Sequence, residues 1–375
     1  MTKNIFPVKS QLIQDFFTAA PSLDKVLIVA MDYAKKSHTV QFCRGNGELL
    51  LKKALTVYNT PKGLVFFHKQ IEKTMKYHHI KKEQVLIVSE EPPLYLYNFI
   101  YRSRLNKFSW AKVNPAEAKK YRETLRASSD IIDLTGIAGA TISRRAVPVQ
   151  DIDPIYTTMK QAARARRRLV ALETALKNRI HSCSDLLFPG FLNEEKSGIS
   201  PFSAASLWLM RDKFSALKIR RMKLENLTKK LRLFRIQEPS KKALQLKQYA
   251  NEVLEAPPEI TIYKQTSLTA KITLLEEARR SIFVEENELA RCLVQTPGFY
   301  LTSIPGIAII LAGCIVAELG NPADWLPLKN QVSYAGIVPR SKQTGGKEKE
   351  PSSGHLPPDC NHVLKDYLIQ AAKSV

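Results

Sequence analysis

The stretches Val26-Leu-Ile-Val-Ala-Met-Asp32 and Val85-Leu-Ile-Val-Ser-Glu90 indicate how the first part of this chain folds. Each is a short apolar run, rich in β-branched residues, that ends in an acid. Such runs predict strands that are buried on both faces of a sheet. Functional groups collect at the carboxyl ends of strands in an open α/β sheet, so Asp32 and Glu90 are candidate site residues.

A second pair of acids lies in the sequence Ser128-Ser-Asp130-Ile-Ile-Asp133. On a helix, a spacing of three residues places both carboxylates on one face, roughly 5–6 Å apart at Cβ. Four converging carboxylates would repel one another, and hard divalent cations bound through oxygen relieve that repulsion. Taken singly, Asp32 is equally well explained as a turn or cap residue, and Asp130 as a helix N-terminal residue. Their order, strand, strand and helix, favours a metal site.

The charge of the chain predicts a polyanionic partner. Its 375 residues carry a formal net charge of +22, with a pI near 9.7. Long basic tracts beside an acidic cluster suit a phosphodiester substrate, although a merely soluble basic surface is the alternative. A third basic run extends from Lys213 to Arg235. The candidate nucleic-acid contacts in the first two runs are Lys119, Lys120, Arg122, Arg126, Arg164, Arg166, Arg167 and Arg168.

The pattern along the chain predicts three regions. Residues 24–150 indicate an α/β domain in which strands at 38–44 and 49–57 follow the first strand, and helices and strands then alternate. Asn114-Pro115 predicts the start of one of these helices, with proline at its first position. Three meander strands followed by this alternation is the order of an RNase H/RuvC-like fold. Residues 154–293 indicate basic helices, either a coiled-coil-like region or a solvated helical linker. Residues 296–375 indicate a mainly α C-terminal domain.

The cysteines and the absence of long apolar stretches bear on the compartment. Five scattered cysteines without a C-x-x-C pair predict a reducing compartment and no zinc site. The N-terminus lacks an apolar signal core, and the apolar stretch at 304–319 is too short to span a bilayer. We therefore expect a cytoplasmic protein without membrane contact.

Two motifs in the C-terminal region have functional interpretations. Pro305-Gly306, in Ile304-Pro-Gly-Ile-Ala, resembles a helix-hairpin-helix turn, which lets backbone amides approach a phosphate. An ordinary helical hairpin fits this pattern equally well. Thr344 lies in the glycine-rich sequence Gln343-Thr-Gly-Gly, where it is an exposed hydroxyl or simply a turn residue.

Together these motifs make the chain similar to the DEDD transposases of bacterial insertion sequences, the insertion-sequence one-ten family, to which the pilin-gene invertases are related. The family motifs appear as Met31-Asp32, Ser128-Ser-Asp130-Ile-Ile-Asp133, Tyr334-Ala-Gly-Ile-Val-Pro-Arg340 and Gln343-Thr344-Gly. The sequence Glu90-Glu-Pro-Pro-Leu-Tyr95 replaces Glu-x-Thr-Gly-x-Tyr, and the spacing to Tyr95 selects Glu90. Ser128 replaces a lysine of the family, and Thr344 stands where the family usually has a serine nucleophile. Family members usually continue beyond the last residues of this chain, so we interpret it as a truncated copy.

The resemblance implies DNA recombination that excises and inserts a mobile element. It implies Mg²⁺, for which Mn²⁺ can substitute, at Asp32, Glu90, Asp130 and Asp133, and a covalent protein–DNA link through Thr344. It also implies DNA contacts by Arg340, a homodimer or homotetramer, and for several family members an element-encoded guide RNA. Two alternatives remain open: a RuvC-like junction nuclease that uses water, and a decayed transposase that only binds nucleic acid.

Overall fold

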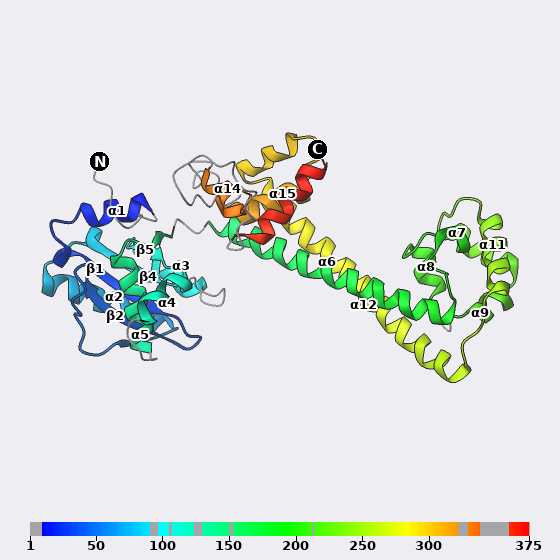
Figure 1. Ribbon diagram of the computed structural model, residues 1–375, viewed down its shortest axis with the longest axis horizontal. Helices are drawn as coiled ribbons and strands as arrows, with labels where there is room; N and C mark the ends of the chain where they lie inside the picture. Colours follow the sequence, from blue (N-terminus) through cyan, green and yellow to red (C-terminus); the bar gives the residue numbers. More distant parts are fainter. Residues whose placement is uncertain are drawn as a thin grey trace, which may run out of the picture. The chain divides into compact units, whose positions relative to one another are not determined.

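The computed structural model describes residues 10–90, 97–104, 107–123, 130–149, 153–211, 214–321, 329–337 and 360–374. Within helices, the side chains of residues 123, 130–132, 329 and 330 lie outside this description. The chain divides into two compact units, residues 1–152 and 153–375, which are treated separately below (Figure 1).

Unit 1 is built on a mixed six-stranded sheet in the order β3-β2-β1-β4-β5-β6. Strands β1, β4 and β5 are parallel, whereas β2, β3 and β6 each pair antiparallel with a neighbour. The two acid-ending runs form the central pair of parallel strands, β1 and β4. The strands are β1 (Leu27–Asp32), β2 (Ser37–Arg44), β3 (Leu55–Tyr58), β4 (Val85–Ser89), β5 (Ser109–Lys112) and β6 (Val147–Pro148).

Helices cover both faces of this sheet. On one face Ile28 and Ala30 of β1 belong to a core that also holds Phe17 and Leu134. On the other face, Val29 belongs to a core with residues of α2 and α3. Burial on both sides explains why these strands read as continuous apolar runs instead of alternating ones. The helices are α1 (Gln11–Thr18), α2 (Pro61–His78), α3 (Tyr97–Arg104), α4 (Pro115–Glu123) and α5 (Asp130–Ile142).

The sequence predictions for unit 1 hold for most elements and fail at two. The strand expected from residue 49 begins only at Leu55, because residues 49–54 form a bridge and bends on the way to β3. Strand β6 was not expected, since its two residues carry too little pattern to be recognised. The cap of α4 is as predicted: the Asn114 side chain accepts a hydrogen bond from the Ala116 amide, at 2.9 Å, ahead of Pro115.

Two long helices organise unit 2, α6 (Pro154–Leu187) and α12 (Pro258–Leu293). They pack against each other in antiparallel orientation along much of their length (Figure 1). The C-terminal part of α6 shares a core with Leu268 and Ile272, and its N-terminal part shares another with Leu289.

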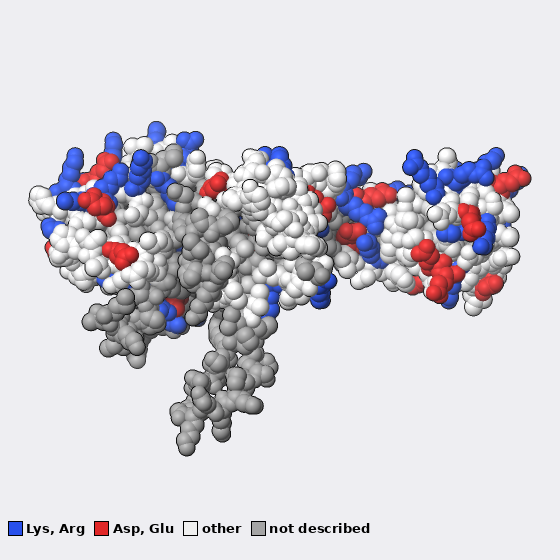
Figure 2. All heavy atoms as spheres, turned by 90° about the horizontal axis from the view of Figure 1, so that it is seen from above, with Lys and Arg blue, Asp and Glu red and all other residues white. Residues whose placement is uncertain are grey.

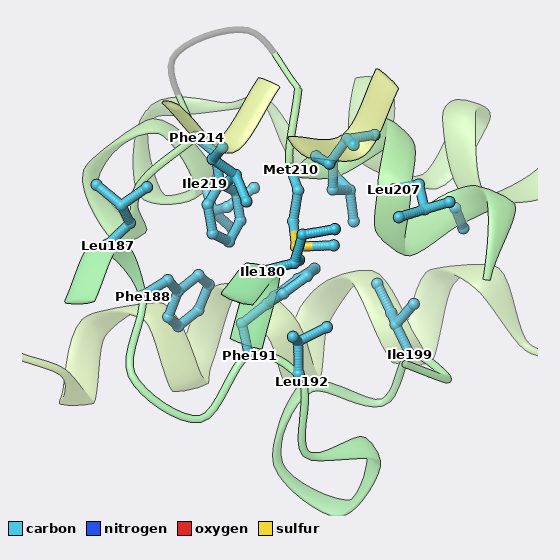
Figure 3. Close-up of a cluster of buried hydrophobic side chains, with 14 of the residues drawn as sticks. Ile180, Leu187, Phe188, Phe191, Leu192, Ile199, Leu207, Met210, Phe214 and Ile219 are labelled. Carbon is cyan, nitrogen blue, oxygen red and sulfur yellow. The ribbon is translucent and has the colours of Figure 1, made fainter. Parts of the chain in front are cut away.

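Between α6 and α12 the chain forms a helical lobe, which comprises residues 188–211 and 214–257. Its interior is apolar: Phe188, Phe191 and Phe214 are buried together with residues from the ends of α6 and α12 (Figure 3). Two helices begin at prolines, at Pro239 and at Pro258, because proline suits the first helical turn. The helices of the lobe are α7 (Glu194–Ser197), α8 (Ala204–Leu209), α9 (Ala216–Arg221), α10 (Leu224–Leu233) and α11 (Pro239–Glu252).

The C-terminal part of unit 2 packs on the other end of the long helices. Its core joins Met159 of α6 and Leu289 of α12 to Ile315 and Leu364. This core therefore includes residues on both sides of the domain boundary predicted near residue 293. No helix in the described part of the chain is long and apolar enough to cross a membrane. The elements are a 3-10 helix (Pro297–Ser303), α13 (Ile309–Leu319), α14 (Lys329–Ala335) and α15 (His362–Ser374).

Candidate active site

Two of the predicted acids lie at neighbouring strand ends in unit 1. Asp32 is the last residue of β1, and Glu90 directly follows β4. The two strands are parallel, and their register pairs Met31 with Ser89. Continuing that register by one residue brings Asp32 beside Glu90. The carboxyl edge of the sheet therefore holds two carboxylates on adjacent strands.

The third acid comes from α5, whose first residue is Asp130. Asp133 lies one turn further along this helix, which packs on β1 and on α4. The contact with α4 is close because Gly136 has no side chain. A Cβ there would lie 2.5 Å from Cγ of Arg122 and 2.7 Å from the carbonyl oxygen of Ala118. Gly136 thus lets the Arg122 side chain lie against α5, next to Asp133.

Arg122 pairs with two of the acids. Its Nη1 donates to Oδ1 of Asp133 at 2.5 Å, and its Nη2 lies 3.6 Å from Oε1 of Glu90. All three side chains are partly buried, with exposed fractions of 26% for Arg122, 30% for Glu90 and 40% for Asp133. The sequence had predicted Arg122 only as a nucleic-acid contact. The separation of eleven residues between Arg122 and Asp133 in the sequence does not indicate that the two side chains are in contact.

The pKa values show that these charges interact. Burial raises the pKa of the Glu90 carboxyl, and the charges of Asp32 and Asp133 raise it further, while Arg122 opposes the shift. The hydrogen bond with Asp133 and the charges of all three acids raise the pKa of the Arg122 guanidinium. The cluster is therefore a group of carboxylates whose mutual repulsion is reduced by one arginine.

These carboxylates have the chemistry that binds a divalent cation, although the described ones are not grouped as metal ligands. An all-oxygen carboxylate set is what hard cations such as Mg²⁺ bind. Among the described side chains, which do not include that of Asp130, no three His, Cys, Asp or Glu are grouped as metal ligands. Arg122 supplies the positive charge beside Asp133 and Glu90 in this arrangement.

Comparison with known proteins identifies the family. Residues 29–189 match a family model described as Transposase, and residues 299–375 match one described as Transposase IS116/IS110/IS902 family. The chain belongs to this transposase family. A protein of Streptomyces coelicolor (strain ATCC BAA-471 / A3(2) / M145), "Insertion element IS110 uncharacterized 43.6 kDa protein", is 27% identical to it over 106 residues. That match spans 28% of this chain and 25% of the relative.

Two other basic candidates in unit 1 of this transposase-family chain, Lys119 and Lys120, lie on α4. Lys119 and Lys120 are exposed, and Nζ of Lys120 lies 3.9 Å from a carboxylate oxygen of Glu117. Glu117 also accepts hydrogen bonds from Arg145, at 2.8 and 3.2 Å. Arg126 lies outside the described residues.

The arginines of α6 bind carboxylates of unit 2. Arg164 forms a two-pronged pair with Glu318, at 2.8 and 3.0 Å, and Arg166 lies 2.7 Å from Glu286. Arg167 lies 2.5 Å from Asp366. Their neighbour Arg168 is exposed. Of these four arginines of α6, all predicted to contact nucleic acid, three are thus paired within the protein.

The most buried of these pairs belongs to a larger network. The Glu318 side chain is fully buried, and it also accepts a hydrogen bond from Asn361 at 2.8 Å. Burial raises the pKa of Glu318, but hydrogen bonds from Arg164 and Asn361 outweigh it, so the pKa is lowered overall. Asn361 also donates to the Tyr334 hydroxyl at 2.9 Å. One carboxylate therefore links α6, α13 and α14 to the start of α15.

The C-terminal motifs of the family are only partly within the described residues. Pro305 and Gly306 are exposed in a turn that Ile307 closes by donating to the carbonyl of Ile304, at 3.0 Å. Gly306 has φ 84°, a left-handed conformation that favours glycine. The turn leads from a 3-10 helix into α13. Thr344 and Arg340 lie outside the described residues.

Proposed function

We propose that this chain is a DNA transposase or recombinase that excises and inserts a mobile element, and that unit 1 is its RNase H-like nuclease domain. One observation carries this proposal. In a chain of a transposase family, acids from β1, β4 and α5 interact electrostatically at the carboxyl edge of the sheet. Such an edge is where catalytic groups collect in α/β domains.

The topology of unit 1 supports the RNase H-like interpretation. A three-stranded antiparallel meander, β1 to β3, is extended on the other side of β1 by parallel strands β4 and β5. This is the strand order expected for that fold. Asp32, Glu90 and the pair on α5 lie at strand ends and on a helix of this domain, which supports their proposed role as its catalytic acids.

The proposed chemistry divides between the acids and a hydroxyl. Asp32, Glu90, Asp130 and Asp133 would hold Mg²⁺, which polarises the scissile phosphate and stabilises the leaving oxygen. The Thr344 hydroxyl would form a bond to phosphorus as the bond to the leaving DNA oxygen breaks, producing a covalent protein–DNA link. The added methyl group of threonine makes this attack more hindered than that of a serine.

Arg122 would have a different role, which is charge compensation. Without it, Glu90 and Asp133 would repel each other and Asp32 in a partly buried setting. A guanidinium can hold such carboxylates and then turn toward a phosphate, since both groups offer a pair of oxygen atoms that accept its two parallel N–H donors. We propose further that the active species is a dimer or tetramer and that a guide RNA selects its DNA sites.

The test is a comparison of Asp133→Asn with Thr344→Ala in a strand-exchange assay with matched element ends. Both variants should lose activity, and only the parent should leave protein covalently attached to DNA in denaturing gels. Full strand exchange by the alanine variant would exclude the covalent scheme and favour a RuvC-like nuclease that uses water. If the parent binds DNA but never cleaves it with Mg²⁺ or Mn²⁺, the chain is a binding protein only.

A further inference from the structure

The helices of the lobe lie in a part of unit 2 that the two family models do not match. The two family models match residues 29–189 and 299–375, whereas all the helices of the lobe, α7 to α11, lie between these matches. Yet the lobe is a folded structure with an apolar interior, to which the ends of α6 and α12 contribute (Figure 3). Its function therefore has to be inferred from its surface.

Exposed cations are concentrated on one segment of this lobe. Between Arg221 and Glu238, six exposed residues are basic and two, Glu225 and Glu238, are acidic. Figure 2 shows Lys and Arg gathered along one edge of the lobe, at the right of the picture. We call this segment the α10 basic face, and its cations are Arg221, Lys223, Lys229, Lys230, Arg232 and Arg235.

The packing of α10 explains why these side chains point outward. Leu227 and Leu231 are buried, one turn apart, and anchor the helix to the core of the lobe. Lys229 and Arg232 lie three residues apart and project from the exposed side. Among the described residues, neither pairs with a carboxylate. Lys230 lies over the Trp208 ring, 5.5 Å from its centroid.

Other basic residues of the lobe hold the structure together. Arg220 donates to the carbonyls of Ala250 and Val253, and Lys247 donates to the carbonyls of Arg220 and Met222. The lobe thus uses some cations as internal donors, whereas the cations of the α10 basic face pair with no carboxylate of the described residues. An accumulation of unpaired like charges destabilises the isolated surface, and a polyanion would relieve it.

We propose that the α10 basic face binds the phosphate backbone of a double-helical nucleic acid. Helix α10 is 10 residues long. At roughly 1.5 Å per residue its cations span several phosphates of a duplex. No aromatic residue in the described part of the lobe is exposed, so unstacked single-strand bases would find no platform. The face therefore suits a duplex, bound without regard to sequence.

The test removes two charges from the full chain. In the variant Lys229→Gln with Arg232→Gln, affinity for a 30-base-pair DNA duplex should fall about 10- to 50-fold at 0.1 M salt. The slope of log affinity against log salt should become shallower by about 2, roughly one for each lost phosphate contact. Both residues are exposed and form no ion pair with the described residues, so the thermal unfolding temperature should not change.

A matched control removes the same charge elsewhere in unit 2. Arg280 and Arg291 are 68% and 60% exposed, and each pairs with a glutamate three residues before it. The double variant Arg280→Gln, Arg291→Gln should keep the parent affinity and slope. An equal loss in both double variants would mean that only net charge matters, and would overturn a specific face.

The nucleic-acid class is decided by parallel titrations. An RNA duplex of the same length should lose affinity as the DNA duplex does if the face reads only a double-stranded backbone. A loss on one duplex alone would identify that nucleic acid as the partner. A loss confined to single-stranded RNA, or no loss with any probe, would overturn the proposal. Duplex binding is measured without cleavage, so a chain that never cleaves DNA would still show the difference between the two double variants, and failure of the catalytic proposal would leave this one standing.

Discussion

Two basic stretches of unit 2, at 164–168 in α6 and at 221–235 around α10, read alike in the sequence but differ in the structure. In α6, Arg164, Arg166 and Arg167 each pair with a carboxylate that lies more than 100 residues away along the chain. Around α10, the exposed cations of the α10 basic face have no carboxylate partner within the described residues. A basic run thus predicts a polyanion-binding surface only where the fold leaves its charges unpaired.

The largest effect expected from this difference is on stability, at Arg164. Arg164→Gln removes the two-pronged partner of a fully buried carboxylate. Breaking a buried pair costs about 3–5 kcal/mol, and the 43% exposure of Arg164 and the remaining Asn361 bond reduce our expectation to about 2–3 kcal/mol. Chemical denaturation should measure it. Arg168→Gln, at the exposed neighbour, is the control and should change stability by less than about 0.5 kcal/mol.

The pH dependence of this loss of stability tests whether the unpaired Glu318 carboxylate causes it. In the parent, the pKa of Glu318 is lowered in the folded state, so its stabilising contribution is present above 4.5 and is lost as pH falls through the lowered value. In Arg164→Gln, burial is opposed by fewer interactions, so we expect this pKa to rise above 4.5. The stability deficit should therefore be greatest at neutral pH, begin to shrink as pH falls through the raised pKa of the variant, and vanish below the lowered pKa of the parent. A deficit independent of pH would point to lost packing instead of lost charge pairing.

The next effect is at Arg122, the arginine of unit 1 that is paired with acids. Arg122→Gln removes a competing positive charge from Asp133 and Glu90, so Mn²⁺ should bind the acid cluster more tightly. A partly exposed pair is worth about 1 kcal/mol, which corresponds to an increase in affinity of somewhat less than tenfold. Titration calorimetry measures this without any catalytic assay. Arg145→Gln, which breaks the pair with Glu117, should leave Mn²⁺ affinity unchanged. Weaker binding in Arg122→Gln would mean that this arginine organises the site for metal.

The smallest effect is expected at Arg167. Its pair with Asp366 is exposed on both sides, at 42% and 46%, and solvent screens such a pair. Arg167→Gln should cost less than about 1 kcal/mol in denaturation, and it should not alter the salt dependence of DNA binding. A shallower salt slope would show that Arg167 leaves Asp366 to bind phosphate, and the contrast between α6 and α10 would then be weaker than the structure indicates.

Local pattern was sufficient for much of this fold. The apolar runs before Asp32 and Glu90 predicted buried strands, and Asn114-Pro115 predicted the start of α4, because each depends on neighbouring residues alone. The start of β3 at Leu55 and the two-residue strand β6 could not be predicted in this way, because pairing partners decide where short strands begin. The sequence did not show where the helices of the lobe, α7 to α11, begin and end, because contacts with distant parts of the chain also decide those boundaries.

The sequence by itself determined the family, the two acid-ending strands and the excess of positive charge, because these reside in composition and in short-range spacing. Only the tertiary structure decided which charges are paired. Glu318 meets Arg164 from 154 residues away, and Asp133 meets Arg122 across a contact that Gly136 keeps open. Electrostatic energy depends on distance and burial, and neither can be read from a linear sequence. The same composition therefore yields a structural ion pair in α6 and an unpaired basic face on α10.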